Sequence, residues 1–60
     1  MSLPRLLSVR AVSEATTLPL STLYDAIAGG ELPAVRIGRA VRVEERDVVA
    51  WIDRQREVTG

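Results

Sequence analysis

A switch in hydrophobic period sets residues 35–43, VRIGRAVRV, apart from the rest of the chain. Apolar and polar positions alternate there on both sides of a glycine, which predicts a β-hairpin with its turn at residues 38–40. If Ile37 pairs with Val41, Arg36 lies directly opposite Arg42 on one face of the hairpin. Like charges that face each other across a sheet destabilise it, so this arrangement indicates a protein that binds a polyanion.

Before the hairpin, apolar residues recur at helical spacing. A first helix is expected at about residues 9–16, with Ser8 as its N-cap and an apolar stripe of Ala11, Val12 and Ala15. The stretch TTLP then ends this helix, because the residue before a proline avoids helical geometry.

A second helix is expected from Pro19 or Leu20 to the glycine pair at 29–30, since proline suits the start of a helix and glycine the position after its end. Its buried face is predicted to be Leu23, Ala26 and Ile27. Its exposed face is small and polar, and consists of Ser21, Thr22 and Asp25, with Tyr24 on the flank.

A third helix, at about residues 45–56, follows the hairpin and starts with several acidic residues, which the helix dipole favours. Val48, Trp51 and Ile52 form its apolar face, and Trp51 is expected in the core. The order helix, short turn, helix, hairpin, helix predicts a mainly α fold with a small β-hairpin, a winged helix-turn-helix.

The chain has 60 residues and no net charge, with eight arginines balancing eight acidic residues. This length allows one domain, residues 1–60, with its core in 6–56. The charge is unevenly distributed, because residues 35–43 contain three arginines and no acid, whereas 44–57 mix both signs. Such a basic stripe on a neutral body is compatible with nucleic-acid binding.

The residue types argue against an enzyme. Histidine and cysteine are absent, which removes the commonest general base and the commonest zinc ligands. We therefore expect no catalysis, no metal or other cofactor, and no small-molecule effector. No apolar run approaches the roughly 18 residues of a membrane span, and MSLPRLLSV makes a poor signal peptide, so a soluble, cytoplasmic protein is expected.

Three separated motifs give a resemblance to a known family. STLY at 21–24, GELPAVRIGR at 30–39 and DVVAWI at 47–52 resemble, in order and spacing, the excisionase-type winged helix-turn-helix domain, a relative of the MerR regulators' DNA-binding region. The resemblance covers residues 6–52. It implies a domain that binds double-stranded DNA through its second helix, in the major groove, and through its wing.

The resemblance also implies which residues contact DNA. Ser21 and Thr22 would reach phosphates or base edges, and Tyr24 would contact the DNA backbone. Arg39 in the wing turn would reach phosphates or the adjacent minor groove. The full set of implied contacts is Leu20, Ser21, Thr22, Tyr24, Asp25, Arg36, Gly38, Arg39 and Arg42.

The chain departs from the family pattern at several positions. Ala11 stands where the family often has Glu, Pro19 where it usually has a Ser cap, and Leu20 where a polar or basic residue is usual. Asp25 and Ala28 replace residues that are typically basic, so the second helix is poor in positive charge. Either the wing supplies most of the attraction, or Asp25 accepts a hydrogen bond from a cytosine amino group. Pairing of Asp25 with a nearby arginine is the third reading.

Several of these residues also have purely structural explanations. Ser21 and Thr22 could serve only the helix N-terminus, and Tyr24 could cap the core. The hairpin arginines could form a solvated face.

Three further arginines lie outside the hairpin. Arg10, on the first helix, is weak evidence for a phosphate contact. Arg54 and Arg56 belong to a mixed-charge segment and are expected to be solvated.

The resemblance implies a phage or mobile-element excisionase, also called a recombination directionality factor. Several copies of such a protein bind tandem sites, bend the DNA and direct an integrase toward excision, so DNA, an integrase and further copies are the implied partners. A MerR-type regulator would add a long dimerisation helix and an effector domain, for which 60 residues leave no room. A minimal MerR-like transcription regulator is the alternative reading, and a protein-interaction module with an exposed Leu20 is a second.

Overall fold

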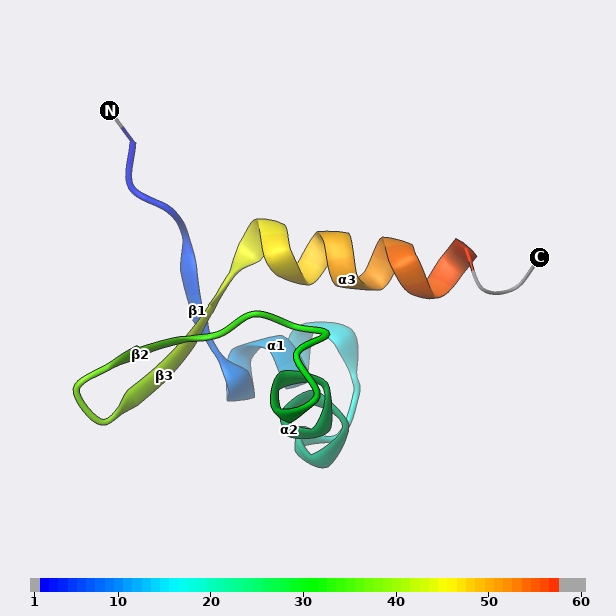
Figure 1. The fold of residues 1–60 in the computed structure, drawn as a ribbon, viewed down its shortest axis with the longest axis horizontal. Helices are drawn as coiled ribbons and strands as arrows, with labels where there is room; N and C mark the ends of the chain where they lie inside the picture. The colour runs from blue at the N-terminus through cyan, green and yellow to red at the C-terminus, as the bar shows by residue number, and fades with distance from the viewer. Residues whose placement is uncertain (1, 58–60) are drawn as a thin grey trace.

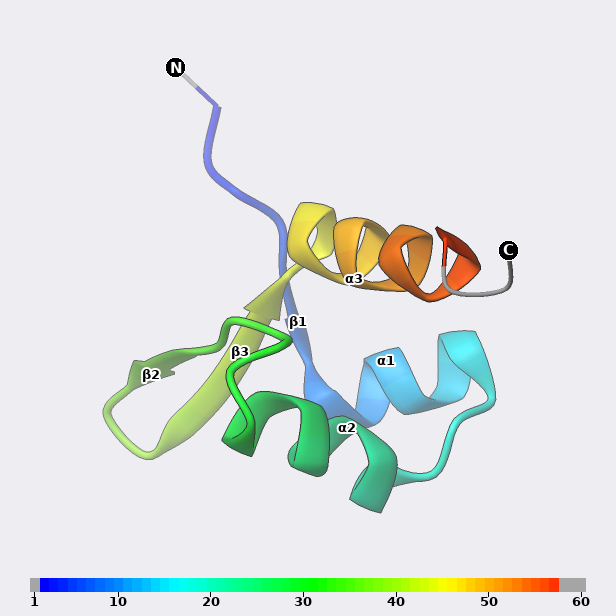
Figure 2. The same ribbon diagram turned by 45° about the vertical axis from the view of Figure 1, so that its right-hand side comes forward.

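The computed structural model of the chain describes residues 2–57 and shows a winged helix-turn-helix (Figure 1). The elements in order are β1 (Leu6–Ser8), α1 (Val9–Thr16), α2 (Leu20–Ala28), β2 (Val35–Ile37), β3 (Ala40–Glu44) and α3 (Glu45–Glu57). The hairpin β2–β3 projects to one side of the helices in both views (Figures 1 and 2), as expected of a wing.

Helix α1 begins at the predicted cap. The Ala11 N–H donates to Ser8 Oγ at 3.0 Å, which satisfies one of the amide groups that a helix start leaves without a partner. Val9 and Val12 are its buried residues, and the predicted burial of Ala15 is wrong because Ala15 is exposed. Ser13 and Thr16 lie one helical turn after Val9 and Val12, on the same side of the helix as these two valines, and both carry hydroxyl groups.

Those hydroxyl residues shape the turn between α1 and α2. Ser13 donates to the Leu18 carbonyl at 2.6 Å, and Thr16 donates to the Val12 carbonyl at 2.7 Å. Thr17 ends α1 in the left-handed region, with φ 59°, and Leu18 packs against the core. These bonds hold together the turn that connects α1 to α2.

Helix α2 ends at the predicted glycine pair in a Schellman motif. The Gly30 N–H donates to the Ile27 carbonyl at 3.1 Å and the Glu31 N–H to the Ala26 carbonyl at 2.9 Å. Gly30 has φ +80°, where a side chain would be strained. The motif turns the chain back so that Leu32, in the following loop, is only 1% exposed.

The sheet has three strands in the order β1-β3-β2, where the sequence predicted only the hairpin. Strand β1 pairs antiparallel with β3, and Leu7 lies opposite Val43. A three-residue strand has too short an alternation to be recognised from its sequence. Its pairing closes one edge of β3 and ties the start of α1 to the wing.

The predicted register of the hairpin is wrong by one residue. Arg36 pairs with Val41 and Ile37 with Ala40, so the turn consists of two residues rather than three. Of the two turn residues, Gly38 has a positive φ, +60°, and Arg39 does not. This combination is typical of a type II′ turn, whose twist matches that of the strands.

The one-residue shift moves side chains to the opposite face of the sheet. Arg36 therefore does not face Arg42, and the like-charge argument drawn from their pairing does not hold. Val35 and Ile37 lie on the outer face with Arg42 and are 40% and 55% exposed, rather than sharing the inner face with Val43.

The core joins all parts of the fold. Its buried members are Val9, Val12, Leu23, Ala26, Leu32, Val43, Val48 and Trp51, which confirms Trp51 as a core residue.

Arg54 of α3 is not simply solvated, because its guanidinium donates to the Glu31 carbonyl at 2.6 Å and ties α3 to the loop after α2. None of the helices within residues 2–57 is long and apolar enough to cross a membrane.

Replacement of Leu32 by alanine should remove a large part of the stability of the fold. Leu-to-Ala changes in a core cost about 2–5 kcal/mol, and a domain of this size has little to spare. Chemical denaturation followed by circular dichroism measures the loss. The matched control is Leu3→Ala, at a position 88% exposed, and equal stability of the two variants would contradict the assignment of Leu32 to the core.

Candidate nucleic-acid interface

The exposed face of α2 is polar, and its side chains make no bonds to the described part of the chain. Ser21, Thr22 and Asp25 are exposed, and none of their side chains has a hydrogen-bond or ion-pair partner within residues 2–57. The structure therefore offers no support for Ser21 or Thr22 as caps of α2, and Asp25 does not pair with an arginine. Ser21 and Asp25 are four residues apart, so they lie on one face of the helix.

Leu20, the first residue of α2, differs from the expectation of an exposed side chain. It is partly buried and packs against the core. Its contact with the core stabilises the start of a helix whose N-cap, Pro19, supplies no side-chain bond. The alternative of a protein-interaction module assumed an exposed Leu20, and the structure does not support that assumption.

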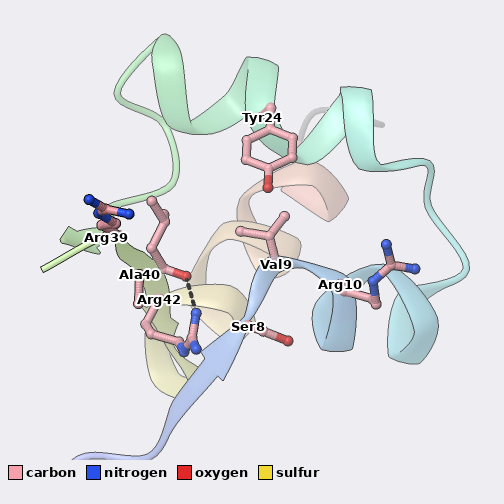
Figure 3. Close-up of a pocket in the computed structure, with 8 residues that line it drawn as sticks. Ser8, Val9, Arg10, Tyr24, Arg39, Ala40 and Arg42 are labelled. Carbon is pink, nitrogen blue, oxygen red and sulfur yellow. Dashed lines mark hydrogen bonds between the residues drawn. The ribbon is translucent and has the colours of Figure 1, made fainter. Parts of the chain in front are cut away.

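Tyr24 lies on the flank of α2 and is 50% exposed. Its ring extends from the helix toward Val9, as Figure 3 shows, and the hydroxyl has no partner within the described residues. A half-exposed ring with a free hydroxyl can contact the core and a ligand together.

A hollow of about 500 Å³ separates Tyr24 from the wing. Its lining comes from three segments: Ser8, Val9 and Arg10 at the start of α1, Tyr24 of α2, and Arg39, Ala40, Val41 and Arg42 of the wing. In Figure 3 the Arg10 and Arg39 side chains lie on opposite sides of it. The structure therefore brings three of the predicted contacts together: Tyr24, Arg39 and Arg42.

Arg36 is the predicted contact that the structure sets apart. It is exposed on β2 and does not line the hollow. Arg36 and Arg42 point to opposite faces of the sheet because of the observed register, so they cannot flank the turn together as expected.

The eight arginines fall into two groups. Four are engaged within the protein, by ion pairs of Arg5 with Glu45, Arg46 with Glu44 and Arg56 with Asp53, and by the bond from Arg54 to the Glu31 carbonyl. The other four, Arg10, Arg36, Arg39 and Arg42, form no ion pair within residues 2–57. Three of these four line the hollow, so the neutral chain has a locally positive surface.

Sequence reasoning considered Arg10 as a weak candidate for a phosphate contact, but it did not predict that Ser8, Val9 and Arg10 lie beside the wing. They reach the wing only because Ser8 pairs with Arg42 across the β1–β3 ladder. The apolar pair Leu6-Leu7 directly before the Ser8 cap is too short a signal to predict this strand. Within residues 2–57 no cluster of carboxylates could hold a metal ion.

Gly38→Ala should loosen the wing turn without any steric clash. A β-carbon built on Gly38 meets nothing within 4 Å, so the expected loss, about 1–2 kcal/mol, comes from the positive φ alone. Thermal unfolding measures it. A synthetic chain with D-alanine at position 38 is the matched control, because a D residue adopts positive φ freely, and equal losses in both chains would contradict this explanation.

Comparisons with known proteins agree with the fold. A family model described as a helix-turn-helix domain matches residues 6–56, which is most of the chain. No curated protein matches, and no solved structure does. The matched residues include α1, the turn, α2, the wing and nearly all of α3. The chain therefore belongs to the helix-turn-helix domain family, a DNA-binding family that includes excisionase-like proteins.

Proposed function

We propose that the chain binds a specific sequence of double-stranded DNA, with α2 in the major groove and the wing on the adjacent backbone. One observation carries the proposal: Tyr24, on the flank of the polar face of α2, borders the same hollow as Arg39 and Arg42, two wing arginines that form no ion pair within residues 2–57. An arginine with no internal carboxylate can contribute its full charge to phosphate contacts, which supply much of the affinity for DNA.

Within this arrangement the side chains divide by role. Ser21 and Asp25 face base edges, and Thr22 contacts a phosphate or a base. Arg39, exposed at the tip of the wing, contacts phosphate or the adjacent minor groove. Arg36 and Arg42, on opposite faces of the wing, contact different phosphates.

Gly38 and Leu20 have supporting roles. Gly38 lets the backbone turn at the tip, with no side chain between the turn and DNA. Leu20 is partly buried, so only the outer part of its side chain is left for contact with DNA.

We further propose that this DNA binding serves recombination, as in excisionases. A module this small covers little DNA, and specific interfaces bury about 600–1,000 Å² even for single small modules. Neighbouring copies on tandem sites, together with bending of the DNA, would supply the remaining free energy and present the DNA to an integrase.

The outer face of the sheet supports contact with a protein neighbour. Leu6, Val35 and Ile37 alternate onto this face, and all three are exposed. A further copy or an integrase on the same DNA would cover it. A minimal transcription regulator is the alternative, and the arrangement of binding sites separates the two.

Selection of tightly bound duplexes from a random pool tests the proposal, followed by gel shifts with increasing protein. We expect enrichment of tandem direct repeats and a ladder of cooperative complexes. One discrete complex on a single or palindromic site would favour a transcription regulator. No enrichment of any duplex would exclude sequence-specific DNA binding.

The Arg39→Ala variant tests the contribution of the wing. It should bind DNA more weakly than Arg46→Ala, which changes an internally paired arginine.

Asp25→Asn should relax specificity at one base pair. A carboxylate that accepts from cytosine N4 discriminates by about 1–3 kcal/mol, and the amide of Asn prefers adenine. Repeating the selection with the variant measures the change. An unchanged preference, together with tighter binding from the lost negative charge, would show that Asp25 does not read a base.

A further inference from the structure

The hollow between α1, α2 and the wing is lined by positive charge that no lining residue balances. Arg10, Arg39 and Arg42 line it, and none of its eight lining residues is acidic. We propose that this hollow is a seat for a DNA backbone phosphate, in which Arg10 and Ser8 of the α1 segment bind the phosphodiester together with Tyr24. The proposal rests on the DNA-binding function and adds α1 as a third contacting element.

A second hollow, of about 380 Å³, shows that an arginine-lined depression in this chain need not be positive. It is lined by residues 2–5 and 44–46, which include two arginines and two glutamates. Arg5 pairs with Glu45 at 3.3 Å and Arg46 with Glu44 at 3.5 Å, so its charges are balanced internally. In the hollow beside Tyr24 no lining residue supplies a balancing charge, so the arginines are available to an anionic ligand.

The donors around the proposed seat are free to bind an anion. Ser8 Oγ accepts from the Ala11 N–H, which leaves the hydroxyl hydrogen available. The Tyr24 hydroxyl and the Arg10 guanidinium have no partner within residues 2–57. Arg42 uses Nη1 for the Val41 carbonyl at 2.9 Å, and its remaining N–H groups are unused.

Ala11 is uncharged, so position 11 places no negative charge at the edge of the hollow. It is the third residue of α1, where a glutamate would complete a capping box with Ser8 and stabilise the helix. No acidic residue occupies the first turn of α1, whereas the first turn of α3 holds Glu45 and Asp47. A carboxylate at position 11 would reach back beside Ser8, at the edge of the proposed seat.

Ala11→Glu therefore separates folding from binding. We expect a melting temperature equal to or above that of the wild type, together with DNA binding weaker by about tenfold, because the added carboxylate repels the phosphate. Fluorescence anisotropy with the duplex enriched by the wild type measures affinity. Ala11→Gln has a similar shape without charge, and Ala15→Glu adds the same charge at an exposed position of α1 outside the hollow. Both controls should bind more tightly than Ala11→Glu.

Arg10→Ala tests the contact directly. Loss of one phosphate contact should weaken binding about tenfold and reduce the slope of log affinity against log salt by about one. Arg46→Ala removes an equal charge from the balanced hollow and should leave the slope unchanged.

The outcomes separate this proposal from the proposed function. Should the wild type bind no duplex, the function itself is wrong. If the wild type binds, while Arg10→Ala keeps the wild-type salt slope and Ala11→Glu binds as well as Ala11→Gln, DNA binding stands and the phosphate seat is overturned.

Discussion

The pairing of β1 with β3 is the contact on which the rest of this structure depends. Ser8 is both the last residue of β1, opposite Arg42, and the cap of α1, bonded to the Ala11 N–H. One residue therefore joins the wing to the helix-turn-helix. Because strand and helix meet there without a loop, the start of α1 is held beside the wing. The hollow that Tyr24 borders exists because of this junction.

The second determinant is the separation of paired from unpaired charge. A chain with no net charge has no long-range attraction to DNA, and exposed charges further apart than about 10 Å are largely screened. Attraction must then come from the local surface. Ion pairs and one backbone bond engage the arginines near α3 and the N-terminal segment, while those on α1 and the wing are left for a partner. This division gives a neutral protein a positive surface around the hollow, where Arg10, Arg39 and Arg42 lie, whereas Arg36 lies apart from it.

Sequence reasoning succeeded where local rules govern. The Ser8 cap, the end of α1 before Pro19 and the glycine end of α2 depend on residues close in the chain, and all were predicted correctly. It failed where distant segments meet. Ala15 was assigned to the core by spacing, although the short α1 meets the core one turn earlier. Arg54 is exposed as expected, but its bond to the loop after α2 was not predicted.

The hairpin is the clearest case in which reasoning from the sequence failed. Alternation predicted two strands, but pairing apolar residues with apolar residues gave the wrong register, because the two-residue turn at Gly38-Arg39 decides it. Periodicity, caps and motifs are local, so the amino-acid sequence alone was enough to predict the three helices, the wing and a helix-turn-helix domain. It could not show which arginines lack partners or that Arg10, Arg39 and Arg42 share one hollow. Charge pairing depends on strand register and on contacts between residues more than 30 positions apart in the sequence, such as Ser8 and Arg42.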